Sequence, residues 1–382
     1  MPGWRIEVVA LAPPTTIAPG TAPIAWALPQ ALADLGHEVR VLYPTVSEGP
    51  APSLRRAHAV PLGSAANGRR EVPRTADFGR RVAAEIDRSA QLWLGFDPAA
   101  GAIPAARGRG PARAYVAETI ALDSLVRPGV AGARSGLRER VGGWLDRRTL
   151  RGLEETAVRR ADAVFATRRG TGERLAELYE VPSRAIHEIP PGVPAPLDVG
   201  TKAQVRLGLH VPPDVPVAAF VGRDPAAEGL ETALAAFRKV RVLFAGARFL
   251  VAGASLPPEP GVLCVGANDA DARARVLRAA DVLLFPAGPS GTPQAPWDAL
   301  GYGIAMIVSA RVPRDGLDDP RAIRTAASDD VGDYASELAE LLADPALRRT
   351  LGEAAKACAA SLTFDRMAER VEKVLRPIVG DR

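Results

Sequence analysis

The sequence predicts an α/β protein of two domains, each built on a parallel β-sheet. Short apolar runs of strand length alternate with segments whose apolar residues recur at helical spacing, first between residues 5 and 43 and again from residue 217 onward. Strands that alternate with helices form parallel sheets. Prolines cluster between residues 190 and 213, which indicates a linker within the 382-residue chain.

The composition excludes several classes of protein. Hydrophobic residues make up 47% of the chain and charged residues 24%, which is typical of a folded soluble protein. A net charge of +4 is too small to indicate a nucleic-acid binder. Two isolated cysteines, four histidines without metal spacing and no apolar run of about 18 residues argue against a disulfide scaffold, a metal centre and a membrane span. We therefore expect a cytoplasmic protein with no bound metal and no tightly bound cofactor.

In the first half, the pattern predicts a strand over 5–11, a helix over 24–35 and a second strand over 37–43. Gly36 suits the C′ position of that helix, and Pro29 indicates that the regular helix starts near it. Residues 44–111 give little pattern, and the remaining predicted elements are helices at 76–90, 136–160 and 171–179 and strands at 113–117 and 163–167.

The second half repeats the alternation and then becomes helical. Its predicted elements are strands at 217–221, 247–252, 261–265, 281–285 and 304–308, and helices at 229–243, 269–280, 295–302, 333–343, 346–360 and 364–376.

The most informative stretch is the turn that joins the strand 217–221 to the helix that begins at Gly229. The strand ends at Gly222, and Arg223 follows it. Such a turn lies at the carboxyl end of a strand, where open parallel sheets bind ligands, and the helix N-terminus offers free N–H groups to an anion. Arg223 would add a positive charge there. The same residues also fit an ordinary turn with a surface arginine, and the local pattern does not decide between the two.

Several segments follow one another in the order found in one known family: 28–42 (LPQALADLGHEVRVL), 159–167 (RRADAVFAT), 178–193, 220–229 (FVGRDPAAEG) and 279–309. They resemble the retaining glycosyltransferases of the GT-B fold, the group that includes glycogen and starch synthases. The resemblance implies two Rossmann-like domains that face a cleft, with C-terminal helices packing across them. It places an acceptor-side domain at 1–195, a nucleotide-sugar domain at 196–362, and a C-terminal helix at 363–382 that returns to the first domain.

The resemblance also assigns the charged donor positions. In the family, an arginine and a lysine five residues apart neutralise the donor diphosphate. Arg223 stands at the arginine position, whereas Glu228 stands at the lysine position, where a carboxylate would repel the diphosphate. In the family's Glu-x7-Glu pair, the second glutamate binds the ribose and aligns with Asp298, while the first lies beside the sugar and aligns with Ser290. Asp298 fits an ordinary helix-face residue equally well.

Four further positions are carried over from the resemblance. Gly20 is the one remaining glycine of a phosphate-binding Gly-Gly loop, and Glu118 is nearest to a histidine of the N-terminal domain. Gly222 and Gly303 keep glycines of the donor-side motifs. The predicted catalytic positions are thus Arg223, Glu228, Ser290 and Glu118, and the predicted donor-binding positions are Gly20, Gly222, Arg223, Asp298 and Gly303. Glu118 also fits a surface turn.

The function implied by the resemblance is transfer of a hexose from a UDP-, ADP- or GDP-linked sugar to a carbohydrate or other hydroxyl acceptor, with retention and without a metal. The altered donor positions leave a second interpretation open, a catalytically inactive GT-B protein that is the partner or regulator of an active glycosyltransferase. A third is an enzyme whose donor carries no diphosphate. We lean to the active hexosyltransferase.

The arginine-rich segment 136–160 could contact an anionic membrane surface. Acidic residues within it offset much of its charge, so we favour a solvated helix.

Overall fold

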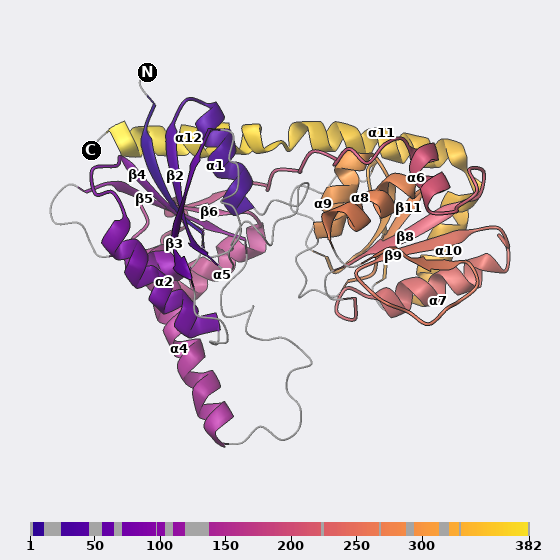
Figure 1. Ribbon diagram of the computed structural model, residues 1–382, viewed down its shortest axis with the longest axis horizontal. Coiled ribbons are helices and arrows are strands. Elements are labelled where there is room, and N and C mark those ends of the chain that lie inside the picture. The colour runs from indigo at the N-terminus through magenta and orange to yellow at the C-terminus, as the bar shows by residue number, and fades with distance from the viewer. Residues whose placement is uncertain are drawn as a thin grey trace. The chain divides into compact units, whose positions relative to one another are not determined.

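The computed structural model divides the chain into two compact units (Figure 1). Among the residues that the structure describes, unit 1 comprises those up to Gly192 together with those from Phe364 onward, and unit 2 comprises those from Val193 to Thr363. The described residues are 3–10, 24–45, 56–64, 71–96, 98–103, 110–118, 137–222, 225–266, 269–287, 294–312, 321–327 and 330–380. Both units are α/β domains built on parallel sheets, so the predicted fold class is confirmed.

Unit 1 contains a seven-stranded parallel sheet in the order β3-β2-β1-β4-β5-β6-β7. Its strand β1 pairs with β2 on one side and with β4, the central strand, on the other. The strands are β1 (Arg5–Val9), β2 (Glu38–Thr45), β3 (His58–Ser64), β4 (Leu92–Gly95), β5 (Ala112–Ala117), β6 (Ala163–Ala166) and β7 (Ile186–Glu188).

Helices cover both faces of this sheet. They are α1 (Ile24–Asp34), α2 (Glu71–Glu85), η2 (Pro98–Ala102), α4 (Leu137–Arg159), α5 (Arg169–Tyr179), η3 (Ser183–Ala185) and α12 (Phe364–Gly380). One core joins α1 and α12 to the sheet, and smaller cores lie under α2 and under α4 and α5. The buried residues of α12, spaced one turn apart, are Met367, Ala368, Val371 and Leu375. The last helix of the chain therefore completes the core of unit 1.

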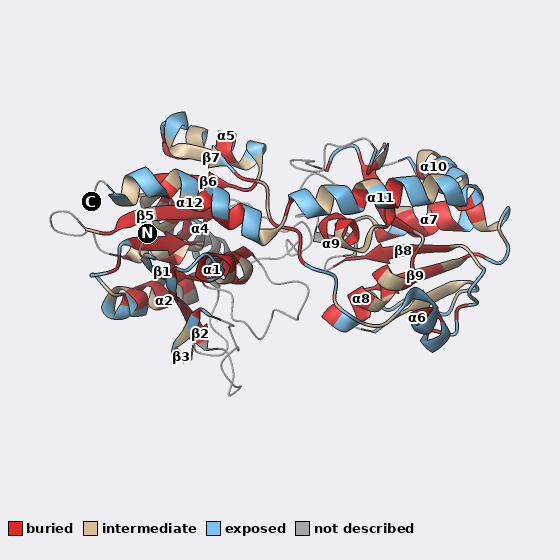
Figure 2. Cartoon of the chain, turned by 90° about the horizontal axis from the view of Figure 1, so that it is seen from above, coloured by how far each residue is buried: buried red, intermediate tan, exposed pale blue. Residues whose placement is uncertain are grey.

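Unit 2 contains a six-stranded parallel sheet in the order β10-β9-β8-β11-β12-β13 (Figure 2 shows its buried strands in red). The strands are β8 (Val217–Val221), β9 (Arg248–Ala252), β10 (Val262–Cys264), β11 (Val282–Phe285), β12 (Ala305–Ser309) and β13 (Arg324–Ala326). The helices are α6 (Lys202–Gly208), α7 (Leu230–Arg241), α8 (Ala270–Ala279), α9 (Gln294–Tyr302), α10 (Val331–Ala343) and α11 (Pro345–Ser361).

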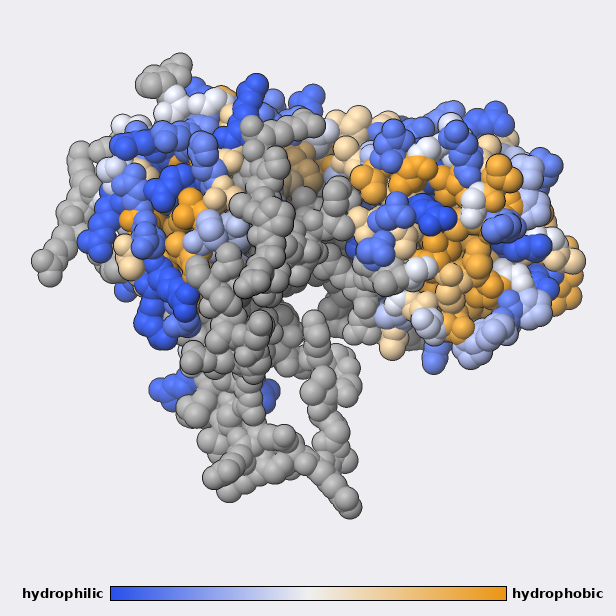
Figure 3. Space-filling view, viewed as in Figure 1, coloured by the Kyte–Doolittle hydropathy of each residue, from blue (hydrophilic) through white to orange (hydrophobic). Residues whose placement is uncertain are grey.

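Two cores fill the two faces of the sheet in unit 2. Residues of α8, α9 and α11 pack on one face, and residues of α7 and α10 pack on the other. Some large apolar side chains stay at the surface, among them Leu207, Val242 and Leu243. Figure 3 accordingly shows a broad apolar area on the visible face of unit 2.

A buried polar cluster fixes the starts of β8 and β11. The guanidinium of Arg206 donates to the carbonyl of Ala279 at 2.9 Å and to the carboxylate of Asp281 at 2.8 Å. Asp281 also accepts from the backbone N–H of Val217 at 2.8 Å and from Lys202 at 2.6 Å. Burial alone raises the pKa of Asp281, but the neighbouring cations and hydrogen bonds hold it below its ordinary value. The carboxylate therefore stays charged and fully engaged.

Some elements differ from the sequence-based expectations. Pro29 lies inside α1 and not at its start, so that expectation was wrong. Gly36 has a φ of +97°, which confirms the predicted left-handed C′ position. A helix, α6, lies between the two proline clusters that indicated a linker. The strands β3, β4, β7 and β13 were not predicted. No described helix is long and apolar enough to cross a membrane.

Glu7 on β1 is a buried carboxylate, with 3% of its side chain exposed, and it pairs with Arg40 of β2 at 3.0 Å. Burial raises the pKa of Glu7 to about 7, although Arg40 opposes the shift, and the nearby Asp87 and Glu38 add repulsion. The unfolded chain releases this proton near pH 4.5, whereas the folded chain holds it to about pH 7. Stability is therefore lost as the pH rises through this window and stays low above it.

We expect Glu7→Gln to raise the free energy of unfolding at pH 8 by up to about 3 kcal/mol, because the variant has no carboxylate to desolvate. At pH 4 the two proteins should unfold alike. Thermal unfolding at both pH values measures the effect, with Glu177→Gln, an exposed carboxylate on α5 of the same unit, as the control. A gain of the same size at both pH values would contradict the raised pKa.

Candidate functional site

The carboxyl edge of the sheet in unit 2 contains a topological switch point. From β8 the chain proceeds to β9 and β10 on one side of the sheet, and then crosses to β11, β12 and β13 on the other. The strands β8 and β11 are therefore neighbours whose outgoing connections lead in opposite directions. In open α/β sheets, ligands bind in the crevice that this arrangement creates beyond the strand ends.

Gly222 follows β8 directly at this edge. Its N–H donates to the carbonyl of Ala252 at 3.2 Å. A Cβ at this position would overlap Oε2 of Glu228 and would lie 2.7 Å from the ring of Phe220. A larger residue here would displace the Glu228 carboxylate and the Phe220 ring, because the Glu228 side chain is folded back over the glycine backbone. The structure thus puts a carboxylate at the carboxyl end of β8.

Gly229 joins this turn to α7. It has a φ of +84° and is the N-cap residue of the helix. A Cβ at this position would lie 2.6 Å from the carbonyl oxygen of Pro286, the residue that follows β11. The turn after β8 and the end of β11 are therefore in close backbone contact. This contact requires glycine both for its conformation and for its lack of a side chain.

Acidic residues lie on both sides of the N-cap of α7. Glu228 precedes Gly229, and Glu231 lies in the first helical turn, while Arg238, Lys239 and Arg241 lie in the last turn. This distribution suits the helix dipole, whose positive end is at the N-terminus. The same end of the helix would attract a ligand anion, which would meet Glu228 there.

Asp298 lies within α9, and its carboxylate is 5% exposed. It forms an ion pair with Arg273 of α8, with 4.0 Å between Oδ2 and Nη2 and 6% of the arginine side chain exposed. The pair links two helices of the same core. Ribose binding by Asp298 remains a prediction, and the structure adds a structural role beside it.

Gly303 lies just after α9 and has a φ of +66°. Its N–H donates to the carbonyl of Leu300 at 3.0 Å, and the next N–H, that of Ile304, donates to Ala299 at 3.2 Å. A Cβ on Gly303 would lie 2.6 Å from Cγ of Lys356 on α11. This glycine therefore ends the helix and lets α11 pack closely.

Other predicted site residues are placed as follows. Glu118 is half-buried and directly follows β5, at the carboxyl edge of the sheet in unit 1. Gly20, Arg223 and Ser290 lie outside the described residues. The structure thus brings Gly222 and Glu228 together at one turn, and it puts Asp298 on the helix that follows β11 and Gly303 directly after that helix. The described part of the chain contains no group of three or more side chains arranged as metal ligands.

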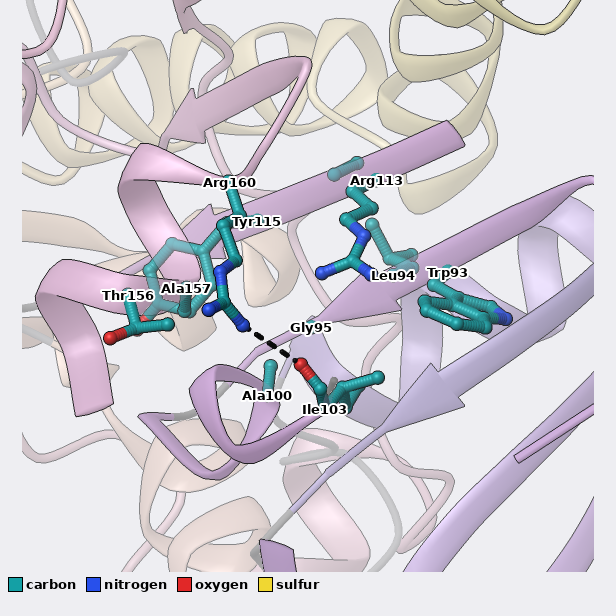
Figure 4. Close-up of a pocket in the computed structure, with 11 residues that line it drawn as sticks. Trp93, Leu94, Gly95, Ala100, Ile103, Arg113, Tyr115, Thr156, Ala157 and Arg160 are labelled. Carbon is teal, nitrogen blue, oxygen red and sulfur yellow. Dashed lines mark hydrogen bonds between the residues drawn. The ribbon is translucent and has the colours of Figure 1, made fainter. Parts of the chain in front are cut away.

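Unit 1 contains a small cavity between η2, α4 and the face of the sheet (Figure 4). Arg113 stacks over the ring of Trp93 at 4.9 Å, and Arg160 donates to the carbonyl of Ile103 at 3.2 Å. The free volume is about 20 Å³, which is room for about one water molecule. The cavity is too small for a nucleotide.

Sequence reasoning missed a buried carboxylate beside this cavity. Glu154 of α4 is 0% exposed. It accepts hydrogen bonds from the phenols of Tyr179 at 2.7 Å and Tyr115 at 3.4 Å. Burial, followed by the neighbouring carboxylate, raises the pKa of Tyr179. The three residues come from three elements, so no local pattern could have revealed them.

Two family models match successive parts of the chain. Residues 20–195 match Glycosyltransferase Family 4, and residues 215–344 match Glycosyl transferases group 1. The chain belongs to the GT-B glycosyltransferases. The switch point between β8 and β11 lies in the part matched by the second model.

Two curated relatives of this GT-B chain are D-inositol 3-phosphate glycosyltransferases, from Xylanimonas cellulosilytica and Segniliparus rotundus. They are both 28% identical to it, over 243 and 240 residues. These matches cover 56% of this chain but only 57% and 52% of the relatives. The chain therefore matches little more than half the length of either relative.

Solved structures are similar over nearly the whole chain. Sucrose-phosphate synthase from Thermosynechococcus elongatus has a TM-score of 0.73 at 18% identity, with 99% of this chain and 100% of that chain covered. Anabaena HepE in complex with UDP-glucose has a TM-score of 0.67 at 12% identity, with 98% and 100% covered. The catalytic domain of Arabidopsis thaliana starch synthase IV, bound to ADP and acarbose, has a TM-score of 0.69 at 13% identity, with 100% of both chains covered. At these identities the likeness shows the fold.

We expect Gly229→Ala to destabilise the protein by about 1–3 kcal/mol, because alanine is strained at a positive φ and its Cβ would meet the backbone of Pro286. Gly246→Ala in the same unit is the matched control, since its Cβ would meet only Val215 at 3.7 Å. Chemical denaturation of the two variants measures the difference. Equal stability would contradict the close approach of the turn to β11.

Proposed function

We propose that this GT-B chain is a glycosyltransferase that transfers a hexose from a nucleotide-diphosphate sugar to an acceptor hydroxyl, with retention. The observation that carries the proposal is the glycine-built turn at the β8–β11 switch point, within the part matched by the Glycosyl transferases group 1 model. The names of the two curated relatives, and the nucleotide or nucleotide sugar bound in HepE and starch synthase IV, support the same activity. They favour an active enzyme over an inactive partner protein.

The proposed donor site is in unit 2. Arg223 would bind the diphosphate, Asp298 would accept a hydrogen bond from the ribose, and Ser290 would lie near the sugar. Because Gly229 has no side chain, the turn after β8 approaches Pro286 at the end of β11 closely. Gly20 and Glu118 belong to the part of the chain matched by Glycosyltransferase Family 4, where the acceptor would bind.

Glu228 limits how well this site binds a diphosphate. Two unit charges 4 Å apart repel by about 4 kcal/mol at the effective dielectric constant of a protein surface, near 20. A penalty of that order lowers affinity by about a thousandfold. Glu228 lies against the backbone at the end of β8, where Arg223 is the next cation in sequence. We infer that Arg223 offsets this repulsion and that the site binds its donor weakly.

Calorimetry with UDP, ADP and GDP tests the proposed donor site. We expect one of these nucleotides to bind and the Arg223→Ala variant to lose that binding at least tenfold, because the diphosphate loses its cation. Lys239→Ala, which removes a charge from the exposed last turn of α7, is the matched control and should bind normally. Absence of binding by all three nucleotides would contradict the proposed function.

We expect Glu228→Gln to raise the affinity for the bound nucleoside diphosphate at least tenfold and to leave the affinity for the corresponding nucleoside unchanged. The variant removes one charge that faces the diphosphate and none that faces the base. Glu353→Gln, which removes an exposed charge from α11 in the same unit, is the control. Equal gains for the nucleoside and the diphosphate would show that Glu228 acts on the packing of the turn and not through its charge.

A further inference from the structure

A groove of about 660 Å³ runs along the margin of unit 1 between β7 and α12. Both elements appear in Figure 2, with the exposed face of α12 in pale blue. The residues that line the groove are Ile186, His187, Glu188, Ile189, Arg370, Lys373 and Val374. The groove lies within one unit and does not involve the proposed donor site.

One wall of the groove is the open edge of a β-sheet. The strand β7 is the last in its sheet, and only β6 pairs with it among the described residues. The N–H of Ile189 donates to the carbonyl of Ala166 at 2.9 Å, on the β6 side. Because N–H and carbonyl groups alternate along a strand, those of Glu188 and the carbonyl of Ile186 point away from β6, while the N–H of Ile186 donates to the carbonyl of Ser183 in the preceding turn. Such an edge can take a further strand through main-chain hydrogen bonds.

The other wall of the groove is positively charged. Arg370, Lys373 and Val374 are spaced three and four residues apart, so they share one face of α12. Arg370 and Lys373 are exposed, and neither forms an ion pair with another residue of the described ranges. The acidic neighbour Glu372 is turned away, because it pairs with Arg376 at 2.8 Å.

Side chains of β7 point alternately to the two faces of the sheet, and this directs the carboxylate of Glu188 away from α12. Ile189 is in the core shared with α12, and the ring of His187 contacts that of Phe165 in the same core at 5.8 Å. Ile186 packs instead with the core under α5, on the opposite face of the sheet. Glu188 has the same parity as Ile186, so its carboxylate points to that opposite face. The side of the edge that faces α12 is therefore cationic.

We propose that this edge docks a short, extended, acidic segment of a partner protein as an eighth strand of the sheet. Its main chain would pair with the N–H and carbonyl of Glu188 and with the carbonyl of Ile186, since the N–H of Ile186 is bonded to Ser183. Every second side chain would point toward α12, where carboxylates would meet Arg370 and Lys373. Since β7 offers three residues, or about 10 Å of edge, the docked segment is short and its affinity modest.

A second copy of this chain fits the edge less well. Pairing β7 with β7 of another molecule would bring two cationic α12 faces together, which costs energy through like-charge repulsion. Apolar segments alone would leave both cations without partners. The charge of the groove thus selects an anionic strand over these alternatives.

The test uses two fluorescein-labelled peptides of seven residues in which valine alternates with glutamate or with lysine. By fluorescence anisotropy at low salt, the wild-type chain should bind the glutamate peptide at least tenfold more tightly than the lysine peptide. The double variant Arg370→Glu/Lys373→Glu should reverse this preference. Arg349→Glu, an exposed charge reversal on α11, is the control and should leave it unchanged.

Backbone pairing is tested with two further glutamate peptides, each N-methylated at alternate amides along one edge. Only one edge of the peptide can pair with β7, so one methylated peptide should lose binding and the other should keep it. Binding of both, or loss of both, would overturn strand addition. Equal binding of the glutamate and lysine peptides, or no response to the double variant, would overturn the charge assignment.

Light scattering of the chain without peptide tests the remaining alternative, a dimer of this chain. A dimer that the double variant disrupts would replace the proposed partner with a second copy of this chain. The Arg223→Ala variant should bind the glutamate peptide normally, so failure of the donor site and failure of the docking edge give different results.

Discussion

The carboxylate of Asp281 joins the two strands on which the candidate site depends. It accepts the N–H of Val217 at the start of β8, and it stands directly before β11. Arg206 and Lys202 of α6 neutralise it, so the segment that enters unit 2 is attached to the same point. With β8 and β11 held in register at their amino ends, their carboxyl ends meet at a defined place. The crevice at the switch point follows from that constraint.

The candidate site owes its shape mainly to two glycines, which have no Cβ. Gly222 gives space to the Glu228 side chain, and Gly229 lets the turn contact Pro286. Each lacks a Cβ where one would overlap another group. Such an edge is sensitive to small additions, since a methyl group on Gly229 would displace the turn from Pro286 and one on Gly222 would displace the Glu228 and Phe220 side chains. Function in this region thus depends on close packing as well as on charge.

The sequence was sufficient for the architecture because apolar periodicity is a local signal. Prediction from the sequence failed where the tertiary context overrode a local rule. β3 includes Pro61, which a central strand would not tolerate, but β3 is the edge strand of its sheet. β4 has only four residues, and Pro29 is accommodated inside α1 because the core of unit 1 packs that helix.

The candidate site was predictable in position but not in geometry. Glycines and charges around residues 222–229 indicated an anion site from their order in the chain alone. The direction of Glu228 depends on its packing against Gly222 and Phe220, which no spacing rule encodes. The proximity of Asp298 to Arg273, from two different helices, is likewise a consequence of tertiary packing.

At the start of α7, Glu228 and Glu231 stabilise the helix but oppose the binding of a phosphate ligand. Carboxylates near a helix N-terminus stabilise the helix by about 0.3–1 kcal/mol each, because they interact with its free N–H groups. A phosphate ligand would use the same N–H groups and would meet the same negative charge. The chain thus gains helix stability from a feature that weakens the site for diphosphates. A lysine at position 228 would reverse both effects, so the glutamate at this turn shifts the balance from ligand affinity toward a stable, unliganded fold.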